Sequence, residues 1–447
     1  MTTPEVSPAI SAPAATGRAT WSVLDQGLSS IASFIPFLLV LHTSTTTQVG
    51  AFGLAYFTFF LILTVIRGLA LEPLVVRHRS RTTDQFRPLA LDTERRGFDS
   101  GAGGSALLGP LHRRTAAAAA VGLAASASAV VGFSMAAVFL IVGGTLAEAF
   151  VPLGLLLPAL LVNDAWRQVF FASLRPRMAF ANDLFYVLLL VALYAVVGTL
   201  MELNLVMIVT VWGLAALGAA LFGGIQARTV PDIGGARRWL RRHRDLGPAN
   251  AIGYAVHRGV EQITMIAVGI IGGLATVGAM TGARALFAPM TTVQSGVSSW
   301  ALPEAARRTE QGTSASIRRF SYAFAGTFAV LMLMAGAALS VVPSGIGEQL
   351  FNETWRPGRQ LLLPMTAFSA MNAADHALAI SLRATEKANQ LLRFRVTTGL
   401  VTITLATAGV MVSGAAGAVW GMTAGSALFV IAASAQLYRV QPRASRD

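Results

Sequence analysis

The sequence contains no cysteine, a single lysine (Lys387), and only 12% charged residues in a length of 447. The absence of cysteine excludes disulfide bridges and thiol chemistry. Soluble domains carry about 25% charged residues, so this chain has too few charges to cover a soluble protein of its length. All other basic residues are arginine, a bias that hints at a GC-rich bacterial genome.

Apolar residues make up 54% of the chain, the mean hydropathy is +0.61, and the apolar residues come in long runs. A helix needs about 20 apolar residues to cross the hydrocarbon core of a bilayer. The runs do not alternate as the strands of a membrane barrel would. The sequence therefore predicts an all-α membrane protein with about twelve transmembrane helices. We place the spans at 21–41, 48–73, 115–142, 146–171, 180–200, 203–224, 248–272, 276–301, 320–342, 359–382, 395–412 and 415–437.

The basic residues are unevenly distributed between the connections. Almost all lie in one alternating set, whereas the other set is short and holds only Arg356 and Arg359. Cytoplasmic loops are rich in arginine and lysine, so the pattern predicts that both termini are cytoplasmic. It also argues against nucleic-acid binding as the reason for the net charge of +13. The basic set comprises 77–114, 167–177, 228–244, 307–319, 383–395 and the C-terminal tail.

The predicted organisation is two six-helix lobes joined by a basic linker. The first 20 residues lack the features of a signal peptide and are typical of a disordered tail. The predicted parts are a disordered cytoplasmic tail (1–20), an N-terminal lobe (21–224) with a cytoplasmic loop (77–114), a cytoplasmic linker (225–247), a C-terminal lobe (248–437) and a cytoplasmic tail (438–447).

A weak internal repeat supports the two lobes. Val49-Gly50-Ala51 opens the second span, and Val277-Gly278-Ala279 opens the eighth, 228 residues later. With six helices in each half, the repeats would be parallel and related by an axis along the membrane normal. Transporters with such repeats bind their substrate between the halves.

Recognisable enzyme motifs are absent from the sequence. There is no nucleophile elbow, no P-loop, no HExxH motif and no histidine pair at metal-ligand spacing beside a carboxylate. We therefore predict that the protein is not an enzyme, and we predict no metal site and no cofactor.

Ionisable residues inside the predicted spans are the candidate functional residues. A charge at the bilayer centre costs at least ~2.5–3.5 kcal/mol, so it usually faces a cavity or a partner. Arg67, Arg258 and Arg284 are predicted to line a cationic cavity between the lobes that binds phosphate. Two alternatives stay open: Arg258 can pair with Glu261 one turn further on, and Arg67 can extend to the cytoplasmic surface.

Four acidic or titratable residues are candidates for ion coupling. They are Asp25 in the first span, Glu261 in the seventh, and Asp375 and His376 in the tenth. Asp25 can equally cap its helix, and Asp375 with His376 can be a polar pair in helix packing.

Several segments resemble the first, second and eighth helices of bacterial polysaccharide exporters and O-antigen flippases. The segments are 21–30 (WSVLDQGLSS), 49–56 (VGAFGLAY), 72–74 (EPL), 284–286 (RAL) and 300–307 (WALPEAAR). These families belong to the multidrug/oligosaccharidyl-lipid/polysaccharide exporter superfamily. The resemblance implies two lobes arranged in a V, alternating access, and outward movement of an undecaprenyl-pyrophosphate-linked sugar.

The resemblance also bears on the arginines. Related lipid II flippases use cavity arginines on their first and eighth helices, and Arg284 is similar to the eighth-helix residue. The first span here contains no arginine, which argues against transport of a peptidoglycan precursor.

The predicted function is therefore a flippase for a lipid-linked oligosaccharide in a bacterial inner membrane. Its expected partners are the lipid-linked glycan, the bilayer and enzymes of glycan synthesis, with no nucleic acid. Two alternatives remain: a cation-coupled exporter of small drugs, which would need carboxylates in its cavity, and a non-transporting membrane scaffold of glycan synthesis.

Overall fold

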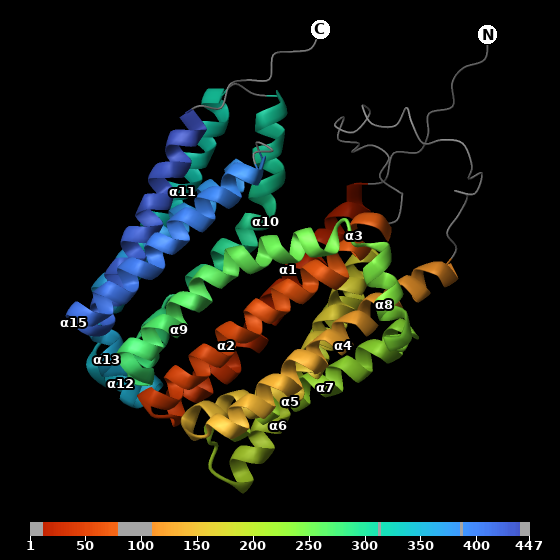
Figure 1. Cartoon of the computed structure of the whole chain (residues 1–447), viewed down its shortest axis with the longest axis horizontal. Coiled ribbons are helices and arrows are strands. Elements are labelled where there is room, and N and C mark those ends of the chain that lie inside the picture. The colour runs from red at the N-terminus through yellow and green to blue at the C-terminus, as the bar shows by residue number, and fades with distance from the viewer. Residues whose placement is uncertain (1–11, 79–109, 312–313, 385–387, 439–447) are drawn as a thin grey trace.

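The computed structural model describes residues 12–78, 110–311, 314–384 and 388–438, and the regular secondary structure in these ranges is entirely helical (Figure 1). Most of the predicted loop 77–114 and of the two predicted tails lies outside the described residues. The N-terminal half contains α1 (Ala12–Thr43), α2 (Thr46–Ile66), the π-helical turn η1 (Arg67–Leu71), α3 (Glu72–His78), α4 (Pro110–Val142), α5 (Gly144–Ala172), α6 (Pro176–Leu200) and α7 (Leu205–Ala227).

The C-terminal half follows a short amphipathic helix, α8 (Ile233–Arg242), which packs on α4. The elements of this half are α9 (Gly247–Ala285), α10 (Ala288–Gln311), α11 (Ser314–Ser340), α12 (Ser344–Phe351), the 3-10 turn η2 (Asn352–Thr354), α13 (Trp355–Gln360), α14 (Leu362–Ala384) and α15 (Ala388–Tyr438).

Within the described ranges, nine helical stretches are long and apolar enough to cross a membrane. Two of them are interrupted. Gly273 breaks α9 with a positive φ of 79°, and Ser413 and Gly414 break α15. Each break divides its helix into two arms. When each arm of α9 and α15 is counted as a helix of its own and α14 is added, the helices occur along the chain in the order of the predicted spans. The breaks fall at the predicted connections 273–275 and 413–414.

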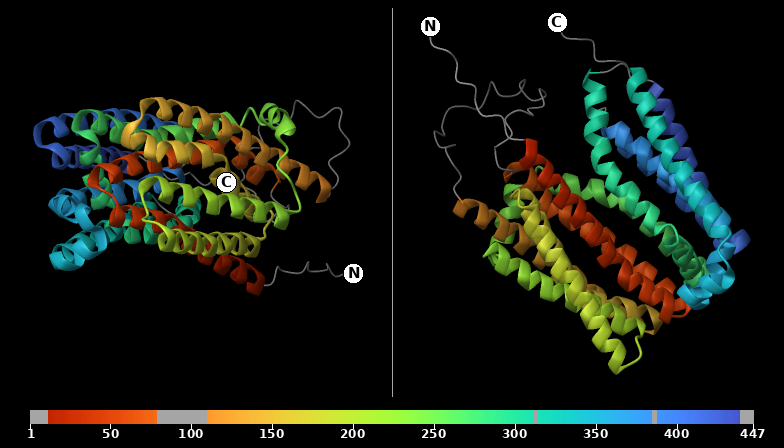
Figure 2. Two further views of the ribbon diagram at one scale, coloured as in Figure 1. Left: turned by 90° about the horizontal axis from the view of Figure 1, so that it is seen from below. Right: turned by 180° about the vertical axis from the view of Figure 1, so that it is seen from behind.

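The helices form two bundles that diverge (Figures 1 and 2). The first contains α1 to α7 and the second contains α9 to α15. The bundles are close together at the end where α12 and α13 lie, and they separate toward the end where the chain termini lie (Figure 1). The strongest packing between the halves joins α2 to α9.

The contact between α2 and α9 centres on two glycines. A Cβ atom on Gly50 would lie 1.9 Å from the carbonyl oxygen of Leu274, and one on Gly278 would lie 1.9 Å from that of Thr46. The contact is reciprocal, as expected at a two-fold axis between equivalent elements. Gly50 and Gly278 are the residues that the repeat pairs, so the repeat marks the place where the halves meet.

Three predicted boundaries differ from the structure. Residues 12–20, assigned to the disordered tail, are helical, because the alanine-rich stretch favours helix and extends α1 toward the N-terminus. The basic connection 307–319 is largely helical, since α10 and α11 continue through it to the gap at 312–313. The eighth span comprises the second arm of α9 and then α10. These two helices meet near Pro289, whose missing N–H favours a new helix start.

We expect Gly278→Val to prevent the close packing of α2 on α9, because the added side chain would overlap the backbone of α2. The yield of folded, monodisperse protein after detergent extraction should fall sharply, with a lower melting temperature. Gly253→Ala is the matched control on the same helix, since a Cβ there meets nothing within 4 Å. Equal behaviour of the two variants would show that the crossing tolerates a side chain.

Candidate functional site

Glu261 lies between two arginines at the interface of the halves. Its Oε1 forms an ion pair with Nη2 of Arg284, and its Oε2 lies 3.7 Å from Nη1 of Arg258. Glu261 and Arg284 belong to the two arms of α9, and the turn at Gly273 brings these arms side by side. Two guanidinium groups share one carboxylate, so this cluster carries a net positive charge.

Aromatic rings hold the guanidinium of Arg284. Its central carbon lies 5.0 Å from the ring centroid of Phe57 on α2 and 5.4 Å from that of Phe368 on α14. Such cation–π contacts are favourable and strengthen when water is excluded. The side chain is 22% exposed, so Arg284 is fixed by three helices yet accessible to a ligand.

A cavity of about 220 Å³ adjoins the cluster. Its lining is formed by Tyr56, Phe57, Phe60, Arg258, Glu261 and Gln262. The Nε2 of Gln262 donates a hydrogen bond to Oγ1 of Thr58 at 2.7 Å, while its Oε1 is buried and lacks a partner among the described residues. The lining thus combines the guanidinium of Arg258, the carboxylate of Glu261 and aromatic walls, contributed by both halves, and Arg284 contacts this lining through Glu261 and Phe57.

Arg67 lies apart from this cavity and is paired within the N-terminal bundle. Its Nε donates to Oδ2 of Asp164 on α5 at 2.7 Å, and its Nη2 contacts the other carboxylate oxygen. The π-helical turn that Arg67 opens places it toward α5. The structure therefore brings Arg258 and Arg284 together and gives Arg67 a bidentate partner instead.

Asp25 belongs to a buried charge network. Arg167 on α5 donates to Oδ2 of Asp25 at 2.8 Å through Nε, which also lies 3.2 Å from Oδ2 of Asp183 on α6. Asp25 is fully buried, and its Oδ1 has no hydrogen-bond partner in the described structure. Together with the nearby pair of Asp164 and Arg67, three carboxylates face two guanidinium groups. The N-terminal network therefore has one carboxylate more than it has guanidinium groups.

Asp375 also has an arginine partner. Arg395 on α15 donates to its Oδ2 at 3.0 Å and lies 3.9 Å above the ring centroid of Phe429. His376 follows Asp375 on α14 and is half-buried. This pair joins α14 to α15 inside the C-terminal bundle, and it is separate from the cluster at Glu261.

Sequence analysis missed four members of these networks: Asp164, Arg167, Asp183 and Arg395. Arg167 and Arg395 were counted with the basic connections, although α5 and α15 extend past them and bury their side chains. A usable signal existed for the two carboxylates. Asp164 and Asp183 lie within predicted apolar spans, where a charge requires a partner. No group of three or more metal-ligating side chains is found among the residues described.

No protein-family model matches the sequence, and no curated protein matches it. The fold, in contrast, is shared with solved structures. An inward-facing multidrug resistance MATE family transporter of the MOP superfamily has a TM-score of 0.67 at 10% identity, covering 94% of this chain and 97% of its own. A lipid II flippase, MurJ, in an inward closed conformation scores 0.62 at 10% identity, covering 93% of this chain and 87% of its own. An outward-facing MATE transporter of the superfamily scores 0.55 at 11% identity, covering 95% and 94%.

These likenesses show the fold of the MOP superfamily, and the neighbours are transporters, not enzymes. The prediction of an all-helical, multi-pass membrane protein with a MATE-like architecture is thereby confirmed.

Replacing Arg167 by leucine should destabilise the N-terminal bundle strongly. Asp25 and Asp183 would lose the cation between them, and breaking a buried pair costs about 3–5 kcal/mol. Thermal unfolding of the purified protein would measure the loss. Arg77→Leu is the control, because its pair with Asp245 is solvent-exposed and contributes at most about 1 kcal/mol. Similar melting temperatures for both variants would contradict a stabilising role for the network.

Proposed function

We propose that this protein is a transporter that moves an undecaprenyl-pyrophosphate-linked oligosaccharide outward across a bacterial inner membrane by alternating access. The observation that carries the proposal is the sharing of Glu261 by Arg258 and Arg284 beside a cavity between the halves. A net positive cluster fits an anionic ligand. The diphosphate can replace Glu261 as the partner of the two guanidinium groups, which bind phosphate through paired N–H donors.

The size of the cavity limits which part of the ligand it holds. A water molecule occupies about 30 Å³ of liquid, so about 220 Å³ accommodates a diphosphate but not an oligosaccharide. The glycan and the lipid tail would therefore extend into the space between the diverging bundles. Phe57 and Phe60 would provide the apolar wall against which a sugar ring or isoprenoid unit packs.

The arrangement of the bundles supports alternating access. They diverge toward the end where the termini lie (Figure 1), and the TM-score is higher with an inward-facing than with an outward-facing neighbour. At the opposite end two hydrogen bonds join the halves: Thr354 Oγ1 donates to the carbonyl of Leu41 at 3.0 Å, and Asn352 Nδ2 donates to that of His42 at 3.2 Å. These bonds would close the outer gate and break as the transporter turns outward.

We further propose the cytoplasmic location of both termini, of 77–114 and of the linker 225–247, on the basis of the positive-inside pattern. The proposed lobes are 21–224 and 248–437, with a tail at 438–447, and the helical residues 12–20 extend α1 ahead of the first lobe. Enzymes that assemble the glycan are the proposed partners at this cytoplasmic face.

Ion coupling would involve the network around Asp25. Its excess carboxylate and the unpartnered Oδ1 of Asp25 would favour uptake of a proton or a sodium ion. Glu261 and Asp375 are weaker candidates, because each has at least one arginine that contacts no second carboxylate among the described residues, whereas Asp25 shares Arg167 with Asp183. His376 stays a candidate beside Asp375.

The network also favours a second candidate function, a cation-coupled exporter of small molecules. The central cavity argues against this candidate. A cationic drug would need carboxylates there, and the single carboxylate of Glu261 is outnumbered by two arginines. A third candidate, a membrane scaffold of glycan synthesis, would not require these arginines at all.

Arg284→Ala should reduce export below about a tenth of wild type, because a charged hydrogen bond contributes about 1.5–3 kcal/mol and each 1.4 kcal/mol is tenfold. The readout is the lipid-linked oligosaccharide that accumulates in a deletion strain carrying the variant, measured by mass spectrometry. Arg284→Lys, which keeps the charge but loses the planar fork, should rescue only partly.

Arg356→Ala is the matched control for this variant, since its side chain is 81% exposed and pairs with Glu348 at the other end of the bundles. Membrane insertion of all variants is checked by detergent extraction. Wild-type export by Arg284→Ala would contradict the diphosphate site, and an unchanged lipid profile with altered drug efflux would favour the small-molecule exporter.

The chain has no cysteine, so a disulfide can be introduced without background. His42→Cys combined with Asn352→Cys should form a bridge across the outer gate, because the two exposed residues are already in contact. Oxidation should then stop export and dithiothreitol should restore it, whereas each single variant should be insensitive. Undiminished export by the fully oxidised double variant would show that this gate does not open.

A further inference from the structure

A second, larger cavity opens at one end of the N-terminal bundle, where α5 and α7 finish and α4 and α6 begin, and its arginines are exposed. Its volume is about 620 Å³, within the range of about 300–1,000 Å³ that small-molecule sites occupy. It is separate from the cavity at Glu261 and shares no lining residue with it. Nothing in the proposed transport cycle uses it.

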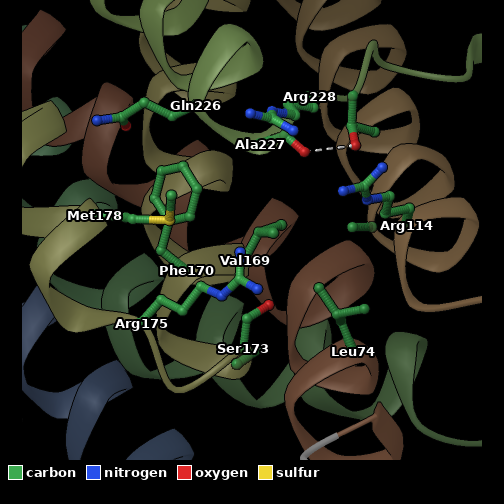
Figure 3. A pocket seen from close by; sticks show the side chains of 13 residues that line it. Leu74, Arg114, Val169, Phe170, Ser173, Arg175, Met178, Gln226, Ala227 and Arg228 are labelled. Atoms are coloured by element: carbon green, nitrogen blue, oxygen red, sulfur yellow. Dashed lines mark hydrogen bonds between the residues drawn. The ribbon is translucent and has the colours of Figure 1, made fainter. Parts of the chain in front are cut away.

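Three arginines converge on this cavity from three segments (Figure 3). Arg114 comes from α4, Arg175 from the turn between α5 and α6, and Arg228 from the end of α7. None of the residues lining the cavity is acidic, and none of the three arginines has an ion-pair partner among the described residues. The cavity therefore concentrates positive charge that the protein itself does not neutralise.

The rest of the lining is amphipathic. Leu74, Val169, Phe170 and Met178 form an apolar wall. Ser173, Gln226 and Thr229 add polar side chains to the lining. A ligand that matches this lining combines an anionic head with an apolar part.

The backbone at two of the lining segments adopts an unusual conformation. The α5 helix ends with Leu174 at φ 57° and α7 ends with Arg228 at φ 49°. At each helix end, the N–H of the residue after the left-handed one donates a hydrogen bond to the carbonyl five residues earlier. These bonds run from Arg175 to Phe170 and from Thr229 to Gly224. This helix-ending motif normally carries glycine at the left-handed position. Here that position of α7 instead carries a guanidinium group that faces the cavity.

We propose that this cavity binds a phosphate-bearing anion, and that its ligand is the head group of an anionic phospholipid. Guanidinium groups bind phosphate in paired fashion, and basic pockets between transmembrane helices at the cytoplasmic side bind acidic lipid head groups. The apolar wall and the location at the helix ends, where the membrane surface would lie, favour a lipid over a soluble phosphate.

The test uses the full-length protein in a neutral detergent, with melting temperature followed during titration. Phosphatidylglycerol, phosphatidylcholine and inorganic phosphate are the three probes. Phosphatidylglycerol should raise the melting temperature saturably, phosphatidylcholine should not, and inorganic phosphate should act only at much higher concentration. A response to inorganic phosphate that phosphatidylglycerol does not reproduce would support the same chemistry with a soluble source.

Arg228→Gly is the decisive variant, because glycine suits the left-handed backbone at this position. Its melting temperature without lipid should equal or exceed that of wild type, while its apparent affinity for phosphatidylglycerol falls about tenfold or more. Arg175→Gln should show the same loss of affinity. Arg238→Gln on α8 is the control, since it removes the same charge from an exposed position of the adjoining helix that is not part of the lining.

A wild-type response by Arg228→Gly, or an equal loss in Arg238→Gln, would overturn the proposal, since either would show only general attraction to the basic face. The export assay separates this site from the transport proposal. Arg284→Ala should keep its response to phosphatidylglycerol, so failure of one proposal leaves the other intact.

Discussion

The close crossing of α2 and α9 at Gly50 and Gly278 is the constraint on which the rest of the structure depends. A side chain at either position would overlap the backbone of the other helix, so only glycine permits this approach. In lipid, helices associate through packing and polar contacts because apolar surface alone gives no preference for protein over lipid. The crossing therefore fixes how the two halves meet.

The same crossing assembles the central cluster. Further along α2 lies Phe57, and further along the second arm of α9 lies Arg284, whose guanidinium stacks on that ring. The turn at Gly273 then returns the first arm of α9 with Glu261 to complete the ion pair. A charge that would be costly in hydrocarbon is stabilised by a carboxylate and two rings, and the side chain remains 22% exposed.

The two bundles differ in the ratio of buried carboxylates to buried guanidinium groups. In the C-terminal bundle Asp375 and Arg395 neutralise one another. In the N-terminal bundle three carboxylates face two guanidinium groups, from Asp25, Asp164 and Asp183 and from Arg67 and Arg167. At the end of the same bundle, Arg114, Arg175 and Arg228 surround a cavity without any carboxylate. This separation of acidic and basic groups within one bundle suits a cation inside the bundle and an anion at its end.

The sequence by itself determined the class of protein and the order of its helices, because hydrophobic run length and the need to bury backbone polar groups in lipid leave few other structures. It also located the equivalent glycines and the partner Glu261 of Arg258, which is one turn away on the same helix. Only the tertiary structure decided that Arg284 shares this glutamate, that Arg67 pairs with Asp164, and that Arg167 lies between Asp25 and Asp183. These pairs join residues far apart in the chain, and helix length and hydropathy say nothing about which faces of different helices meet.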